Sequence, residues 1–182
     1  MATLVFIDTE FTRLGGDGLP GLISIGLISE DGEECYVEVD DFVPEDCSDF
    51  VLTNVLPLRT GPMFSRAAAS EAVWTFLAGL ASKPAILIHD YFVDIELCLA
   101  LLRSTNTQDD WQHIVVGYCS ARQQATSQAF IDSRQQFAAQ PGFVLHHALH
   151  DARALRAGWQ GWSALHPSSR GNLIMELSPE RS

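Results

Sequence analysis

Basic residues are scarce in this chain of 182 residues, which has 11 Lys and Arg against 23 Asp and Glu and a formal net charge of −12. Proteins that bind duplex nucleic acid broadly need a basic surface, so this charge argues against that class. An enzyme that holds divalent cations stays compatible, because its carboxylates are themselves negative and the bound ions reverse the local field.

Long apolar runs and paired cysteines are also lacking. No apolar run reaches the roughly 18 residues that a membrane span requires. The first residues, 1–8, lack a basic region and end on Asp8, unlike a secretory signal, so we expect a soluble, cytoplasmic protein. None of the four cysteines belongs to a C-x-x-C pair, and we expect reduced, mostly structural thiols: Cys35, Cys47, Cys98 and Cys119.

The order of apolar patterns predicts the fold class. The length is typical of one domain, which we expect over residues 1–166, followed by a loosely ordered tail at 167–182. Strands are predicted at 3–8, 22–28, 34–39, 85–88 and 113–116. An Asp31-Gly32 hairpin joins the second and third. We therefore predict an α/β protein with a mixed five-stranded sheet, whose first three strands form an antiparallel meander, and helices packed on it.

Apolar residues at helical spacing predict the helices. Ser70 is the expected cap of one helix, and a long exposed helix is expected over 120–139. The other predicted helices are a short one at 49–54, one with the stripe Ile95, Cys98, Leu99 and Leu102, and a last one with Ala148, Ala152, Leu155 and Trp159 on one face.

The first candidate segment for chemistry is Phe6-Ile7-Asp8-Thr9-Glu10-Phe11. Residues two apart in a strand point the same way, so Asp8 and Glu10 should face one side together at the strand's end. Two close carboxylates are costly unless a cation neutralises them. The alternative is a pair of solvated acids.

Two later segments place further acids at the starts of helices. Asp94 is predicted on the first turn after 85–88, where the helix dipole tolerates an acid, and helix capping by Asp90 or Asp94 is the alternative. The segment from His146 to Asp151 packs three histidines and an acid around the start of the last helix.

Two other site types could use these clusters. A zinc site would use His146 and His150, one helical turn apart, but the Glu that follows the first His in the metalloprotease motif is missing. The pairs His89-Asp90 and His150-Asp151 are typical of HD-type phosphohydrolases, yet that family resembles an all-helical domain and this chain opens with strands.

Taken in order, the three segments resemble the DEDDh exonucleases, the superfamily of RNase T, oligoribonuclease and the polymerase proofreading subunits. Asp8-Thr9-Glu10 matches the Asp-x-Glu motif, and His146 to Asp151 matches His-x4-Asp. The segment His89 to Asp94 matches the second motif more loosely, because Asp90 and Val93 stand where Asn and Phe are usual. A narrower likeness, which includes Phe6 to Thr12 and Leu22 to Leu27, is to small bacterial and phage 3′–5′ exoribonucleases of mycobacterial type.

This resemblance implies a ribonuclease H-like fold, a homodimer and two Mg²⁺ or Mn²⁺ ions, and hard oxygen ligands suit those metals. The metal ligands would be Asp8, Glu10, Asp94 and Asp151, with His146 as general base. The reaction implied is release of nucleoside 5′-monophosphates from the 3′ ends or short 3′ overhangs of RNA. A DNA exonuclease and a non-catalytic nucleic-acid-binding protein on the same fold are the alternatives.

Substrate contacts are expected directly after the first motif. Phe11 and Leu14 are the candidates to flank the terminal base, since bases stack on aromatic side chains, and a core position for Phe11 is the alternative. Arg13, Arg122 and Arg153 are candidates for phosphate contacts, and the sequence does not choose among them.

Overall fold

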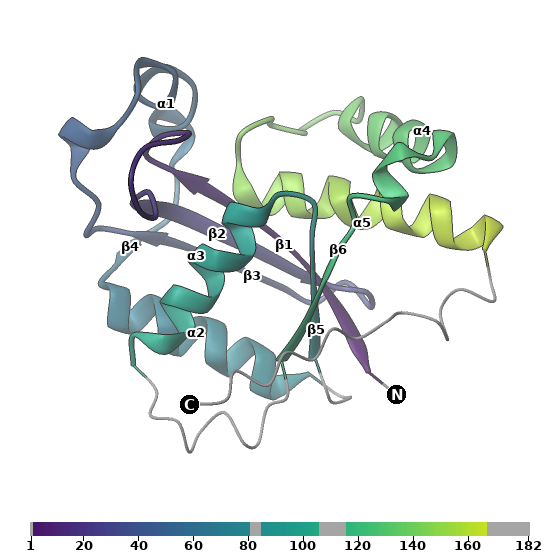
Figure 1. The fold of residues 1–182 in the computed structure, drawn as a ribbon, viewed down its shortest axis with the longest axis horizontal. Coiled ribbons are helices and arrows are strands. Elements are labelled where there is room, and N and C mark those ends of the chain that lie inside the picture. Colours follow the sequence, from purple (N-terminus) through teal and green to yellow (C-terminus); the bar gives the residue numbers. More distant parts are fainter. Residues whose placement is uncertain (1, 81–84, 106–115, 167–182) are drawn as a thin grey trace.

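A mixed sheet with helices on both faces forms the centre of the molecule (Figure 1). The computed structural model describes residues 2–80, 85–105 and 116–166. Its strands are β1 (Thr3–Phe11), β2 (Leu22–Ser29), β3 (Glu34–Val39), β4 (Met63–Phe64), β5 (Ala85–His89) and β6 (Val116–Ser120). Its helices are α1 (Asp49–Asn54), α2 (Arg66–Gly79), α3 (Phe92–Arg103), α4 (Gln128–Ala138) and α5 (Ala148–Leu165), with 3₁₀ helices at Pro44–Asp46, Leu56–Leu58 and Gln124–Thr126.

The strands lie in the order β4-β3-β2-β1-β5-β6. β1, β2 and β3 are antiparallel neighbours, and β5 and β6 continue the sheet in parallel from β1. The predicted α/β class with its mixed sheet is confirmed, and the arrangement is consistent with a ribonuclease H-like fold. The strand order departs from a simple meander because the two-residue β4 pairs in parallel with β3 at the edge. A strand that short has no periodicity for a sequence to reveal.

Alternation along β1 divides the core into two layers. Leu4 and Phe6 pack with residues of α4 and α5 on one face of the sheet, including Phe130 and Trp159. Val5 and its neighbours on the other face pack with residues of α2 and α3. Figure 1 shows α4 and α5 side by side at one part of the sheet and α2 and α3 side by side at another. Side chains at odd and even positions of a strand point to opposite faces, which is why one strand serves both layers.

Several predicted elements need correction. Ser65 rather than Ser70 caps α2, since its side chain accepts a hydrogen bond from the Ala68 N–H at 3.3 Å, and Ser70 is buried inside the helix. The long helix predicted over 120–139 is shorter, because Ser127 caps α4 and a 3₁₀ helix precedes it. The strand predicted at 113–116 meets the described residues only at Val116, where β6 begins. Residues 113–115 and the predicted tail at 167–182 lie outside the described residues.

Other expectations concern the last helix, the thiols and the membrane. α5 buries Ala148, Ala152, Leu155 and Trp159, as its apolar stripe predicts. Cys35, Cys47 and Cys98 are free thiols. Within the described part of the chain, no helix combines the length and the apolar character that crossing a membrane requires.

Gly26 is the point at which α5 meets the sheet. It lies in β2 directly opposite Asp8 of β1. A Cβ built on Gly26 would lie 2.3 Å from the backbone nitrogen of Leu149, in the first turn of α5. No side chain fits in that space, so the helix start rests directly on the strand backbone. The same contact brings Asp151 of α5 over the part of β1 that carries Asp8.

Gly26→Ala should therefore destabilise the protein. The added methyl group must push the first turn of α5 away, and overpacking of this kind costs about 1–3 kcal/mol. We expect a lower midpoint in urea and thermal unfolding, followed by circular dichroism. Gly79→Ala is the matched control, because its Cβ would meet nothing within 4 Å and alanine favours a helix. A Gly26→Ala protein as stable as wild type would contradict this account of the contact.

Candidate active site

β1 carries the first two acids toward a pocket of about 540 Å³. The strand runs on to Phe11, three residues beyond the predicted end, with an irregularity in its pairing between Glu10 and Phe11. The pocket gathers residues from distant parts of the chain. It is lined by Asp8, Thr9, Glu10, Phe11, Arg13, Leu14, Ser48, Phe50, Val51, Val55, Tyr91, Asp94, Arg134, Leu145, His146 and Asp151.

Asp94 reaches this pocket from α3, which packs on the face of the sheet opposite to α5. It lies in the first turn of α3, as the sequence predicts, and is 2% exposed. Its Oδ1 accepts hydrogen bonds from the backbone N–H of Thr9 at 3.2 Å and from the Thr9 hydroxyl at 2.7 Å. Thr9 stands between the two acids of β1, so these bonds fix Asp94 beside them.

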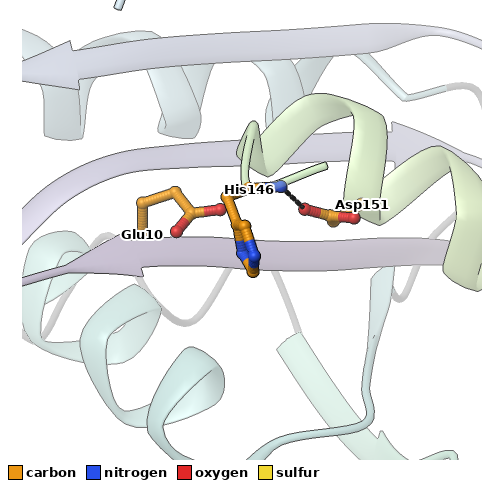
Figure 2. A group of neighbouring side chains, drawn as sticks. All are labelled: Glu10, His146 and Asp151. Carbon is orange, nitrogen blue, oxygen red and sulfur yellow. Dashed lines mark hydrogen bonds between the residues drawn. The ribbon is translucent and has the colours of Figure 1, made fainter. Parts of the chain in front are cut away.

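The start of α5 supplies the third segment. Asp151 accepts a hydrogen bond at 2.9 Å from the backbone N–H of His146 (Figure 2). His146 has a φ of 64°, in the left-handed region that residues other than glycine rarely adopt. Strained backbone of this kind clusters at functional sites. The turn places the His146 ring between Glu10 and Asp151 in Figure 2, and the ring lies nearly perpendicular to that of Phe50, with centroids 4.9 Å apart.

Two sets of side chains could each hold a metal ion. One consists of Glu10, His146 and Asp151, and the other of Asp8, Asp90 and Asp94. Within each set the potential ligand atoms lie within 4.8 Å of one another. Carboxylate oxygens dominate both sets, which fits hard cations such as Mg²⁺ or Mn²⁺.

The other two site types weighed from the sequence fit less well. The zinc alternative needs His150, but the Nδ1 of His150 accepts the Val144 N–H at 2.8 Å. His150 also belongs to neither of the two sets. The all-helical phosphohydrolase is excluded by the sheet.

Burial and mutual repulsion raise the pKa values of these acids. The pKa of Asp8 lies well above its usual range because the carboxyl is desolvated and because Asp94, Asp151 and Glu10 are near. Desolvation, with repulsion from Asp151 and Asp94, raises the pKa of Glu10 to about 8. Burial raises the pKa of Asp94 to about 7, against the opposing hydrogen bonds from Thr9. Without cations, the folded site thus retains protons at neutral pH.

The apolar side of the pocket includes the two residues predicted to contact a base. Leu14 is 75% exposed and lines the pocket. Phe11 fits both the predicted base contact and the core alternative, since it packs against the core and also lines the pocket. Its ring stacks on that of Tyr91, with ring centroids 6.3 Å apart. Phe50 and Leu145 extend this apolar wall, and the sequence predicted no base contact for either.

The structure places some of the arginines in the pocket and others outside it. Of the three arginines considered, Arg13 lines the pocket, whereas Arg153 pairs with Glu34 at 2.6 Å outside it and Arg122 is exposed. Arg134 of α4 also lines the pocket, and no sequence pattern predicted its place there. Its segment is polar and glutamine-rich, and nothing local distinguishes Arg134 from a solvated residue.

Comparison with known proteins finds a local likeness. A stretch of 57 residues, 31% of this chain, is 44% identical to the 3′-5′ exoribonuclease Rv2179c of Mycobacterium tuberculosis (strain ATCC 25618 / H37Rv). The same figures apply to the 3′-5′ exoribonuclease MT2234.1 of M. tuberculosis (strain CDC 1551 / Oshkosh). The match spans 33% of the length of each relative. No family model matches the chain.

The raised pKa values predict that the metal-free protein loses stability as the pH rises. The ordinary values are 4.5 for Glu10 and 3.8 for Asp94, against about 8 and about 7 in the folded protein. Between these values the folded state binds more protons than the unfolded state, so the free energy of unfolding falls with increasing pH. We expect the thermal midpoint in EDTA to fall from pH 5 to pH 8.

Asp8→Asn is the matched variant for this measurement. The amide keeps the shape of the side chain but removes one of the repelling charges. Its thermal midpoint should fall less steeply over the same pH range and exceed that of wild type at pH 8. Equal slopes for the two proteins would show that the acids do not repel one another as described.

Proposed function

We propose that this protein is a metal-dependent 3′–5′ exoribonuclease that releases nucleoside 5′-monophosphates from the 3′ ends or short 3′ overhangs of RNA. The observation that carries the proposal is the convergence of Asp8, Glu10, Asp94 and Asp151 with His146 in one pocket. The order and spacing of these residues resemble the DEDDh exonucleases. The local likeness to mycobacterial proteins named as 3′-5′ exoribonucleases supports both the polarity and the choice of RNA.

The four acids would hold two Mg²⁺ or Mn²⁺ ions. Glu10 and Asp151 belong to one set of potential ligands and Asp94 to the other, and Asp8 is the residue proposed to serve both ions. When bound, such ions stabilise the attacking and the leaving oxygens of a phosphodiester. The protein contributes a rigid arrangement of carboxylates, whose raised pKa values reflect how poorly the fold tolerates their charges without cations.

His146 would act as the general base. Its hydrogen bond to Asp151 uses the backbone N–H and so does not occupy the imidazole. The ring reaches the pocket beside Glu10, where it would accept a proton from the attacking water (Figure 2). A neutral imidazole has one ring nitrogen that can accept a proton.

The apolar wall would receive the terminal nucleotide. Phe11, Tyr91 and Phe50 offer aromatic surface, and Leu14 and Leu145 are exposed beside them. Stacking of a base on an aromatic ring contributes about 1–3 kcal/mol and tolerates different bases. A homodimer, implied by the same resemblance, belongs to this proposal as well.

A nuclease assay tests the proposal directly. 5′-labelled single-stranded RNA, the matching DNA and a duplex RNA with a 3′ overhang would each be incubated with Mg²⁺, Mn²⁺ or EDTA. We expect RNA to shorten from its 3′ end only with metal. His146→Ala should lower the rate by about 10²–10⁴-fold, the contribution typical of a general base. Arg66→Ala is the matched control, since Arg66 pairs with Asp41 away from the pocket.

The outcomes of this assay separate the alternatives. Faster shortening of the DNA would favour the DNA exonuclease. No shortening of any substrate with either metal would contradict the enzymatic proposal and leave nucleic-acid binding as the function.

Metal binding can be measured without any substrate. Mg²⁺ or Mn²⁺ should raise the thermal midpoint of the wild-type protein, because a ligand that binds only the folded state stabilises it. The increase should be larger at pH 8 than at pH 6, since protons compete with metal for the carboxylates. Asp8→Asn should lose most of the increase. An equal increase in this variant would place the metal elsewhere.

A further inference from the structure

Arg134 brings a positive charge into the acid-rich pocket from α4. It lies among the pocket-lining residues with Asp8, Asp94 and Asp151. Its Nη1 pairs with Oδ2 of Asp90, which belongs with Asp8 and Asp94 to one of the two sets of potential metal ligands. The function proposed above assigns no role to either Arg134 or Asp90.

The position of Arg134 is fixed by the packing of α4 on α5. A Cβ at Gly158 of α5 would lie 2.7 Å from the Phe130 ring, and one at Gly161 would lie 1.9 Å from the Ser133 hydroxyl. The two helices are therefore in direct contact just before Arg134. α5 also carries Asp151, so the guanidinium group and this acid are held by one rigid pair of helices.

The guanidinium group is close enough to act on the acids and open enough to meet a ligand. Its charge lowers the pKa of Asp151 against the larger effect of burial. The Arg134 side chain is 35% exposed, whereas that of Asp90 is 19% exposed. A guanidinium group has five N–H donors in a planar fork, which suits the oxygens of a phosphate.

Arg13, the other arginine of the pocket, is placed differently. Its Nε lies 3.0 Å from the Cβ position of Gly16, and its side chain also lines a neighbouring pocket at the 15–20 loop. Arg134 is the arginine whose described ionic contact lies inside the set of acids.

We propose that Arg134 binds the phosphate of the terminal nucleotide, and that Asp90 is the positioning residue that holds the Arg134 side chain in place. This inference rests on the proposed function. The guanidinium group would bind the negatively charged phosphate oxygens in the pocket that the acids also line. The ion pair with Asp90 would keep the long Arg134 side chain in the pocket. An Asp at position 90 provides the charge that an Asn would lack for this purpose.

Binding of adenosine 5′-monophosphate, compared with adenosine, tests the phosphate contact. Titration calorimetry in Mg²⁺ would compare wild type with Arg134→Ala, Arg134→Lys, Asp90→Asn and the control Arg66→Ala. We expect Arg134→Ala to weaken monophosphate binding by about 10–100-fold, the range for a hydrogen bond to a charged group. Adenosine binding should change less than twofold, Arg134→Lys should restore part of the loss, and Arg66→Ala should match wild type.

Kinetics and unfolding complete the test. On RNA, Arg134→Ala should raise KM more than Arg134→Lys does, and Asp90→Asn should lie between wild type and Arg134→Ala. If Arg134 only ties α4 to the rest of the protein, its loss would lower Tm and leave monophosphate affinity unchanged, which would overturn the inference. Equal losses for the monophosphate and adenosine would also overturn it. If wild type cleaves RNA but Arg134→Ala binds the monophosphate as wild type does, only this inference is contradicted. If wild type cleaves no RNA, the proposed function itself is contradicted.

Discussion

At Gly26 the backbone of β2 touches the first turn of α5 with no side chain between them. Gly26 stands opposite Asp8, so this contact sets how near α5 comes to the acids of β1. From there, Asp151 and His146 gain their places through one short turn, closed by the hydrogen bond between them. A larger residue at Gly26 would separate the two halves of the site even though it touches none of the acids.

The clustered acids destabilise the fold that brings them together. Asp8, Glu10, Asp94 and Asp151 all have raised pKa values because burial disfavours their charged forms, and nearby carboxylates, Asp90 among them, add repulsion. Thr9 and the His146 N–H offset part of this for Asp94 and Asp151. The well-packed layers on both faces of the sheet stabilise the fold against the unfavourable clustering of these carboxylates. Because the cluster is already assembled, cations could bind to it without a large rearrangement.

The sequence was most informative where the chemistry is local. Asp8 and Glu10 are two residues apart on a strand, and His146 and Asp151 flank a helix start, so short spacings predicted their grouping. Arg134 and Asp90 meet only through tertiary structure, 44 positions apart. Asp90 belongs to the loosely matched second motif, but no pattern predicted its partner, and Arg134 lies in a polar segment without a pattern of its own. Ser65 and Ser70 are both acceptable caps by residue type, and the packing of α2 selects the first.

The bonds from Thr9 to Asp94 connect a strand with a helix on one face of the sheet, while Asp151 reaches the same strand from the other face. The complete set of acids therefore exists only while both helical layers stay docked. Partial unfolding of either layer removes Asp94 or Asp151 from the set. Binding of a cation by the complete set is therefore coupled to the docking of both layers. Cations bound there would contact acids from both layers and so stabilise the docking of the layers on the sheet.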